Sequence, residues 1–164
     1  MGQCAPLDPT AALDPAGATV RFEDPPVNRP PALMIGQKYG GIIESLLPMT
    51  MGPGISTFAP DVALRAGQRL PGLIGEEVDE LHHSFSGLAL GQTPLTVVEH
   101  PGTVLVGMTV WVSPLGNRVF DAGTFDYSWG LDPRYAAALP GFPAGAFSEL
   151  TARILGWLGA LPGR

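Results

Sequence analysis

The sequence predicts a protein of strands and coil that ends in one amphipathic helix, and three stretches carry this prediction. Residues 103–113 are rich in β-branched Val and Thr, which fit a pleated, packed surface better than a helix. Residues 114–117 supply turn chemistry and residues 118–123 form a second strand, so together they predict a β-hairpin. Apolar residues recur at helical spacing from Phe147 to Leu161, which predicts the closing helix.

The other predicted elements are short, because glycine and proline interrupt the chain throughout. The 22 glycines and 18 prolines make up about a quarter of the sequence, which is typical of a loop-rich fold. Residues 73–81 alternate and predict a strand that places Glu77 and Asp79 on one face. Further strands are predicted at 18–23, 32–37 and 96–100. The stretches between them are predicted as a loop at 50–60, a turn at 62–70 and a connecting link at 88–95. Residues 135–139 are predicted to form a helical turn that Pro140 ends.

Length and composition predict one domain with an irregular leader. A chain of 164 residues is long enough for one domain and too short to expect two. Residues 1–30 are rich in proline and predict a flexible lead, whereas residues 31–164 carry the folded part. Cys4 is the single cysteine, which excludes an internal disulfide bond. The sequence has no signal-peptide pattern and no apolar run long enough to cross a membrane, so we expect a cytoplasmic protein.

The charge of the chain argues against two classes of partner. The formal net charge is −6 at pH 7, and Lys38 is the only lysine. Nucleic acids and anionic membranes both require a basic face. The sequence therefore predicts neither nucleic-acid nor membrane binding.

The densest polar cluster follows the alternating stretch, where Glu76, Glu77, Asp79 and Glu80 precede His82 and His83. Carboxylates beside imidazoles can perform general acid–base catalysis or bind a metal. The spacing matches no zinc signature, so a solvated strand end with a charged turn is the competing interpretation. The residues alone leave both interpretations open.

Aromatic and polar residues gather after the predicted hairpin, in residues 123–130. Ser128 lacks the glycine two positions before it that a nucleophile elbow needs, so a turn or capping serine is the preferred interpretation. Trp129 and Trp157 are predicted packing anchors. Asp121 and Asp126 are either supporting acids of a site or strand-end polar groups.

Two of these stretches carry a family resemblance. The run GNRVFDAGTFDYSWGLD at 116–132 and the block LPGLIGEEVD at 70–79 resemble the C-terminal part of the N,N-dimethylformamidase large-subunit-like family. The helix from Phe147 to Leu161 fits the family's closing helix. The resemblance covers roughly residues 30–160.

This resemblance implies an α/β fold, as part of a three-layer domain like that of class I glutamine amidotransferases. It implies a hydrolase acting on the C–N bond of small amides, with Glu77 at the position of a family glutamate near the active site. Asp79, Ser128 and Trp129 are weaker candidates for substrate binding. An aromatic residue usual in the family is replaced by Glu76, which alters the electrostatics around Glu77.

The same resemblance implies an iron cofactor held by tyrosinate and glutamate ligands. Tyr39, Tyr127 and Tyr135 are the only tyrosines, and none falls on a recognisable ligand motif. The metal ligands therefore stay unassigned in this chain.

The resemblance also implies that the chain is a C-terminal fragment or subunit, inactive alone and completed by an upstream half-domain or another subunit. Bare strand edges and sheet faces then predict a homo- or hetero-oligomer. Two alternatives stay open: a non-catalytic scaffold that binds protein or carbohydrate, and a small self-contained protein of unrelated function. The sequence alone does not name the substrate.

Overall fold

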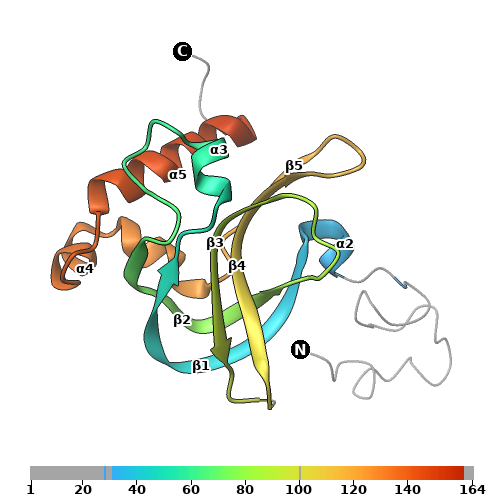
Figure 1. Ribbon diagram of the computed structural model, residues 1–164, viewed down its shortest axis with the longest axis horizontal. Coiled ribbons are helices and arrows are strands. Elements are labelled where there is room, and N and C mark those ends of the chain that lie inside the picture. Colours follow the sequence, from blue (N-terminus) through green and yellow to red (C-terminus); the bar gives the residue numbers. More distant parts are fainter. Residues whose placement is uncertain (1–27, 29–30, 100, 161–164) are drawn as a thin grey trace, which may run out of the picture.

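The computed structural model describes residues 28, 31–99 and 101–160, and within them the chain forms one antiparallel sheet with short helices around it (Figure 1). The strands follow the order β1-β2-β4-β3, and β5 pairs with the second half of β4. The strands are β1 (Gln37–Thr50), β2 (Arg69–Leu81), β3 (Leu88–Thr96), β4 (Thr103–Val112) and β5 (Arg118–Asp121). The helices are α2 (Pro31–Ile35), α3 (Gly54–Phe58), the 3₁₀ helix η1 (Phe125–Leu131), α4 (Pro133–Ala138) and α5 (Ala144–Leu158).

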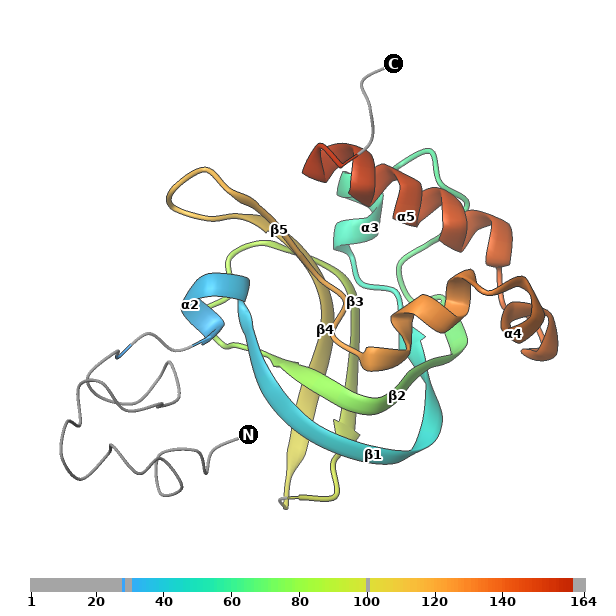
Figure 2. The ribbon, with the colours of Figure 1, turned by 180° about the vertical axis from the view of Figure 1, so that it is seen from behind.

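The sheet curls until its two ends meet (Figure 2). Met51, directly after β1, forms an antiparallel bridge with Gly91 of β3. The next residue, Gly52, donates its backbone N–H to the carbonyl oxygen of Leu90 over 2.8 Å. This closure satisfies backbone groups that an open sheet would leave unpaired at its edges.

One hydrophobic core fills the curl and continues beneath α5. On β4 the side chains of Val104, Val106, Met108 and Val110 are almost completely buried. Phe147, Leu150 and Ile154 of α5 join the same core. Because these three residues recur at spacings of three and four, one face of α5 is apolar and covers the sheet.

The hairpin and the C-terminal helix confirm the sequence prediction. Residues 103–112 and 118–121 pair antiparallel, with Val112 opposite Arg118. The turn between them contains Gly116 at φ 83°, a backbone conformation that glycine adopts without strain. Helix α5 begins three residues before the predicted Phe147 and ends at Gly159, which has φ 79° and caps the helix in the left-handed conformation.

Three predicted elements are wrong, and a fourth, the loop predicted at 50–60, contains helix α3. Residues 32–37 were expected to form a strand, but residues 31–35 form α2, because Pro31 suits a first helical turn and Gly36 at φ 81° ends it. Residues 88–95 were expected to form a link, but they lie in β3, and the strand predicted at 96–100 is absent from its described residues 97–99. Pro94 is tolerated because β3 is an edge strand, which forms its long ladder of hydrogen bonds with β4 on one side only.

The content of strands with a few helices is that of a mixed α/β protein. The glutamine-amidotransferase-like arrangement is not confirmed, since every described strand pairing is antiparallel. The predicted strand at 18–23 and most of the predicted lead lie outside the described residues.

Candidate functional site

Two aspartates from distant parts of the sequence meet where β2 approaches the loop after β5. Asp79 lies near the end of β2, and Asp121 is the last residue of β5. The backbone N–H of Asp79 donates to the carbonyl oxygen of Gly123 over 3.0 Å, and Val78 forms a bridge with Thr124. Strands β2 and β4 pair at Glu80 and Val106, so the segment after β5 covers β2 beside that point.

Burial raises the pKa of both carboxyl groups, and the charge of a neighbouring carboxylate adds to the shift of each. The pKa of Asp121 is raised to about 6, chiefly by desolvation. The N–H of Gly123, which donates to Oδ1 over 2.8 Å, partly opposes this shift, and the charge of Asp79 adds to it. Desolvation also raises the pKa of Asp79, with the charge of Glu77 adding to it. A carboxyl group that titrates near neutral pH can accept or donate a proton under physiological conditions.

The wall beside this pair is polar and tightly packed. Gln37 is completely buried and donates through Nε2 to the carbonyl oxygen of Gly107 and to Oγ1 of Thr109, over 2.7 and 2.9 Å. Thr109 lies directly opposite Asp121 in the β4–β5 ladder. Oε1 of Gln37 has no hydrogen-bond partner among the described residues, which leaves an acceptor available in this wall.

Tyr39 of β1 lies next to Asp79 and forms a hydrogen bond with Glu99. Tyr39 pairs with Asp79 in the β1–β2 ladder. Its hydroxyl donates to Oε1 of Glu99 over 2.7 Å, and the backbone N–H of Ile42 donates to Oε2. The hydrogen bond to Glu99, with burial and the nearby carboxylates, raises the pKa of Tyr39 to about 12, so this phenol stays protonated at neutral pH.

Glu77, which the resemblance places near an active site, does not point into the core. Its side chain is exposed, and so is that of Glu76. The backbone of Glu76 has φ 55°, and the β1–β2 register slips between Ile43 and Leu47, so the regular alternation breaks at this point. The side chain of Val78 points into the core. Glu77 and Asp79 share the opposite face of β2, which is partly covered at Asp79 and exposed to solvent at Glu77.

Ser128 and Trp129, the remaining predicted site residues, both lie in η1 and do not join the aspartate pair. Ser128 is exposed and lies inside η1, whose start is capped by Thr124. A nucleophile elbow would instead place the serine on the sharp turn between a strand and a helix. Trp129 is half exposed and packs edge-on against Tyr135, with 5.0 Å between the ring centroids. Trp129 also lines a pocket that contains Asp126, a residue that the sequence indicated only as a polar group near a site.

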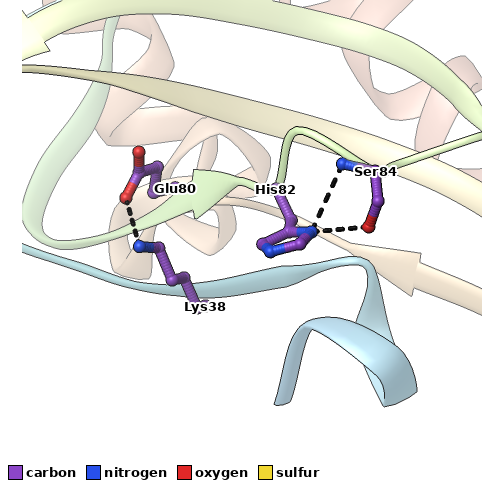
Figure 3. A network of polar contacts seen from close by, with 4 residues as sticks. All are labelled: Lys38, Glu80, His82 and Ser84. Carbon is purple, nitrogen blue, oxygen red and sulfur yellow. Dashed lines mark hydrogen bonds and ion pairs between the residues drawn. The ribbon is translucent and has the colours of Figure 1, made fainter. Parts of the chain in front are cut away.

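The predicted acidic–histidine cluster does not converge on one point (Figure 3). Glu80 forms an ion pair with Lys38 over 3.1 Å. Nδ1 of His82 accepts from the backbone N–H of Ser84 and contacts Oγ of the same residue, at 3.3 and 2.6 Å. The cluster thus divides into local contacts along the β2 end and its turn.

The ligands of the iron that the resemblance implied stay unassigned among the described residues. No three His, Cys, Asp or Glu side chains among them come together as metal ligands. Each tyrosine is engaged elsewhere: Tyr39 with Glu99, Tyr127 with Thr151, and Tyr135 with the carbonyl oxygen of Gly72. Burial raises the pKa of Tyr127 to about 12.

These features define a strand-rich domain with a paired-carboxylate site where β2 meets the segment after β5. The chain belongs to the N,N-dimethylformamidase beta subunit-like, C-terminal family, whose model matches residues 5–138. The match begins and ends earlier than the sequence motifs suggested and leaves α5 outside it. No curated protein and no solved structure matches the chain. None of the described helices is both long and apolar enough to cross a membrane.

Proposed function

We propose that this chain is a C-terminal domain or subunit of an N,N-dimethylformamidase-type hydrolase that cleaves the C–N bond of small amides together with a partner segment or subunit. The family match over residues 5–138 carries this proposal. Amide hydrolysis requires a polarised carbonyl group, an activated water and proton delivery to the leaving amine. Because the described side chains offer no fitting iron-ligand set, the partner would hold the metal in its glutamine-amidotransferase-like part.

The paired aspartates would handle protons. The water oxygen bonds to the carbonyl carbon, the C–N bond breaks, one proton of the water passes to a carboxylate, and a proton reaches the amine nitrogen. Asp121 has a pKa of about 6, so its carboxylate is the principal form at pH 7 and its acid form is still accessible. Asp79 lies beside it, and the negative charge of Asp79 helps to raise the pKa of Asp121.

Glu77 has a different place in this proposal. Its exposed carboxylate shares a face with Asp79 and raises the pKa of Asp79. A partner that covers this face would desolvate Glu77 and bring it to the edge of the site. Glu77 would then be the contact between the partner's substrate region and the aspartate pair.

The decisive experiment uses the assembled protein. We would tag the chain in its source cells, isolate it with whatever binds it under native conditions, and measure amine release from N,N-dimethylformamide and small N-alkyl amides. We expect activity in the complex and none in the purified chain alone, with or without added iron. A complex that releases no amine from any of these amides would refute the hydrolase function.

Asp121→Asn tests the role of the pair within an active complex. We expect at least a hundredfold loss of kcat, because proton transfer by a positioned side chain contributes about 10²–10⁴-fold. Glu149→Gln is the matched control, since Glu149 is exposed on α5 and outside the family match. If Asp121→Asn assembles and keeps full activity, the chain acts as a non-catalytic scaffold.

A further inference from the structure

A pocket separate from the aspartate pair contains a buried carboxylate without a partner. The pocket has a volume of about 210 Å³ and lies between the bulged part of β1, the middle of β2 and the η1–α4 segment. Asp126 as a residue is only 4% exposed, and its side chain lines the pocket rather than being sealed in the core. Among the described residues no hydrogen bond or ion pair reaches its carboxylate oxygens, and the one hydrogen bond of Asp126 to Thr124 uses its backbone N–H. A buried charge without a partner is costly, so this group requires an explanation.

Thr124 and Gly75 position Asp126 on the side away from the pocket opening. The backbone N–H of Asp126 donates to Oγ1 of Thr124, and the same hydroxyl contacts both the N–H and the carbonyl oxygen of Gly75. A Cβ atom at Gly75 would lie 1.8 Å from Oδ2 of Asp126. Glycine at position 75 therefore provides the space in which the carboxylate lies.

The remaining walls combine negative charge with aromatic and aliphatic surface. Glu44 and Glu76 line the pocket and are exposed, and no lysine, arginine or histidine lines it. Trp129 and Tyr135 form an edge-on pair on one side, and Leu46 is exposed on another. Burial, with the charge of Glu76, raises the pKa of Asp126, as expected for a carboxylate that lacks a counter-ion.

We propose that this pocket binds a small alkylammonium ion, with its ammonium group against Asp126 and its alkyl group against Trp129 and Leu46. A carboxylate with aromatic faces is the combination that recognises organic cations. The volume is below that of pockets for drug-sized ligands, which favours an amine of a few carbon atoms. A buried ion pair formed on binding would also remove the cost of the isolated Asp126 charge.

This site does not depend on the proposed amide hydrolysis. The amine released from a small amide is protonated at neutral pH and is therefore an alkylammonium ion. Amines from any other reaction belong to the same chemical class. Binding can therefore be tested on the purified chain, whatever its enzymatic activity proves to be.

The test is calorimetric titration of the full chain with n-butylammonium chloride at pH 7.5. The neutral isostere n-butanol and the lysine analogue Nα-acetyl-lysine methylamide serve as comparison ligands. We expect saturable binding of n-butylammonium, at least tenfold weaker binding of n-butanol, and weaker binding of the bulkier lysine analogue. Equal binding of the alcohol, or binding of the lysine analogue alone, would overturn the proposal, the latter indicating a protein side chain as the natural occupant.

Asp126→Asn isolates the charge, because asparagine keeps the shape of the side chain. We expect this variant to bind n-butylammonium at least tenfold more weakly and to melt at the same or a higher temperature, since the unpaired charge is gone. Glu149→Gln, on the exposed face of α5, is the matched control and should bind as the wild type does. Unchanged binding by a folded Asp126→Asn variant would refute the site, as would the absence of saturable binding by the wild type.

Discussion

The backbone N–H of Asp79 donates a hydrogen bond of 3.0 Å to the carbonyl oxygen of Gly123. This contact joins β2 to the residues that follow β5, and it places Asp79 beside Asp121. Gly123 also donates its own N–H to Oδ1 of Asp121. One glycine therefore connects both members of the aspartate pair.

Gly123→Ala should be strongly destabilising. Gly123 has φ 71°, and a Cβ atom there would lie 1.9 Å from the carbonyl oxygen of Gly107, a backbone atom that cannot rotate away. Gly116→Ala is the control, because Gly116 has φ 83° but open space around it. We expect the free energy of unfolding to fall by about 2 kcal/mol more for Gly123→Ala than for Gly116→Ala in urea denaturation. Equal losses would show that the loop relaxes away from β4.

Asp121 should make stability depend on pH in the weakly acidic range. Its folded-state pKa is about 6, against 3.8 for the ordinary side chain, so the folded protein holds the proton more tightly than the unfolded chain. The stability contributed by the protonated group is then present below pH 4 and lost as the pH rises towards 6. Relative to wild type, Asp121→Asn should gain on the order of 2 kcal/mol between pH 4 and 7, allowing for partial solvent screening. A parallel pH dependence of the two proteins in urea denaturation would contradict this.

The two aspartates should be electrostatically coupled. The charge of Asp79 raises the pKa of Asp121, so Asp79→Asn should lower it. Carboxyl-carbon NMR titration of Asp121 in the wild type and in the variant measures this directly. An unchanged Asp121 titration in this variant would mean that the side chains point apart.

Gly75 and Asp126 should show strong non-additivity. A Cβ atom at position 75 would overlap Oδ2 of Asp126, so Gly75→Ala should cost about 1–3 kcal/mol by displacing the carboxylate. Adding Asp126→Ala removes the overlap and should recover part of that loss. A double-mutant cycle by thermal or urea unfolding measures the coupling, and additive effects would rule out direct contact.

Tyr39 should titrate well above an ordinary tyrosine because of Glu99. The hydrogen bond and negative charge of Glu99 raise the pKa of Tyr39 to about 12. Glu99→Gln keeps a hydrogen-bond acceptor and removes the charge, so the pKa of Tyr39 should fall towards 10. Alkaline ultraviolet titration follows the phenolates, and Tyr39→Phe identifies which transition belongs to Tyr39. A transition for Tyr39 near 10 in the wild type would contradict the Glu99 contact.

Patterns of short range were readable from the sequence. The β-branched run at 103–112, the turn at Gly116 and the strand at 118–121 specify the β4–β5 hairpin, because neighbouring residues alone determine its turn and alternation. The apolar period of α5 predicted the helix in the same way. Family membership was also readable, since residues 70–79 and 116–132 carry the motifs and the match spans 5–138.

Only the tertiary structure decided which acidic residues are buried. The resemblance placed Glu77 near an active site, but the positive φ of Glu76 and the register slip between Ile43 and Leu47 leave the side chain of Glu77 exposed. Asp121 gains part of its environment from Asp79, and Asp126 gains its own from Gly75; both of these neighbours lie on β2, distant in the sequence. Burial and charge–charge repulsion depend on what packs across the fold, and no local period encodes those contacts.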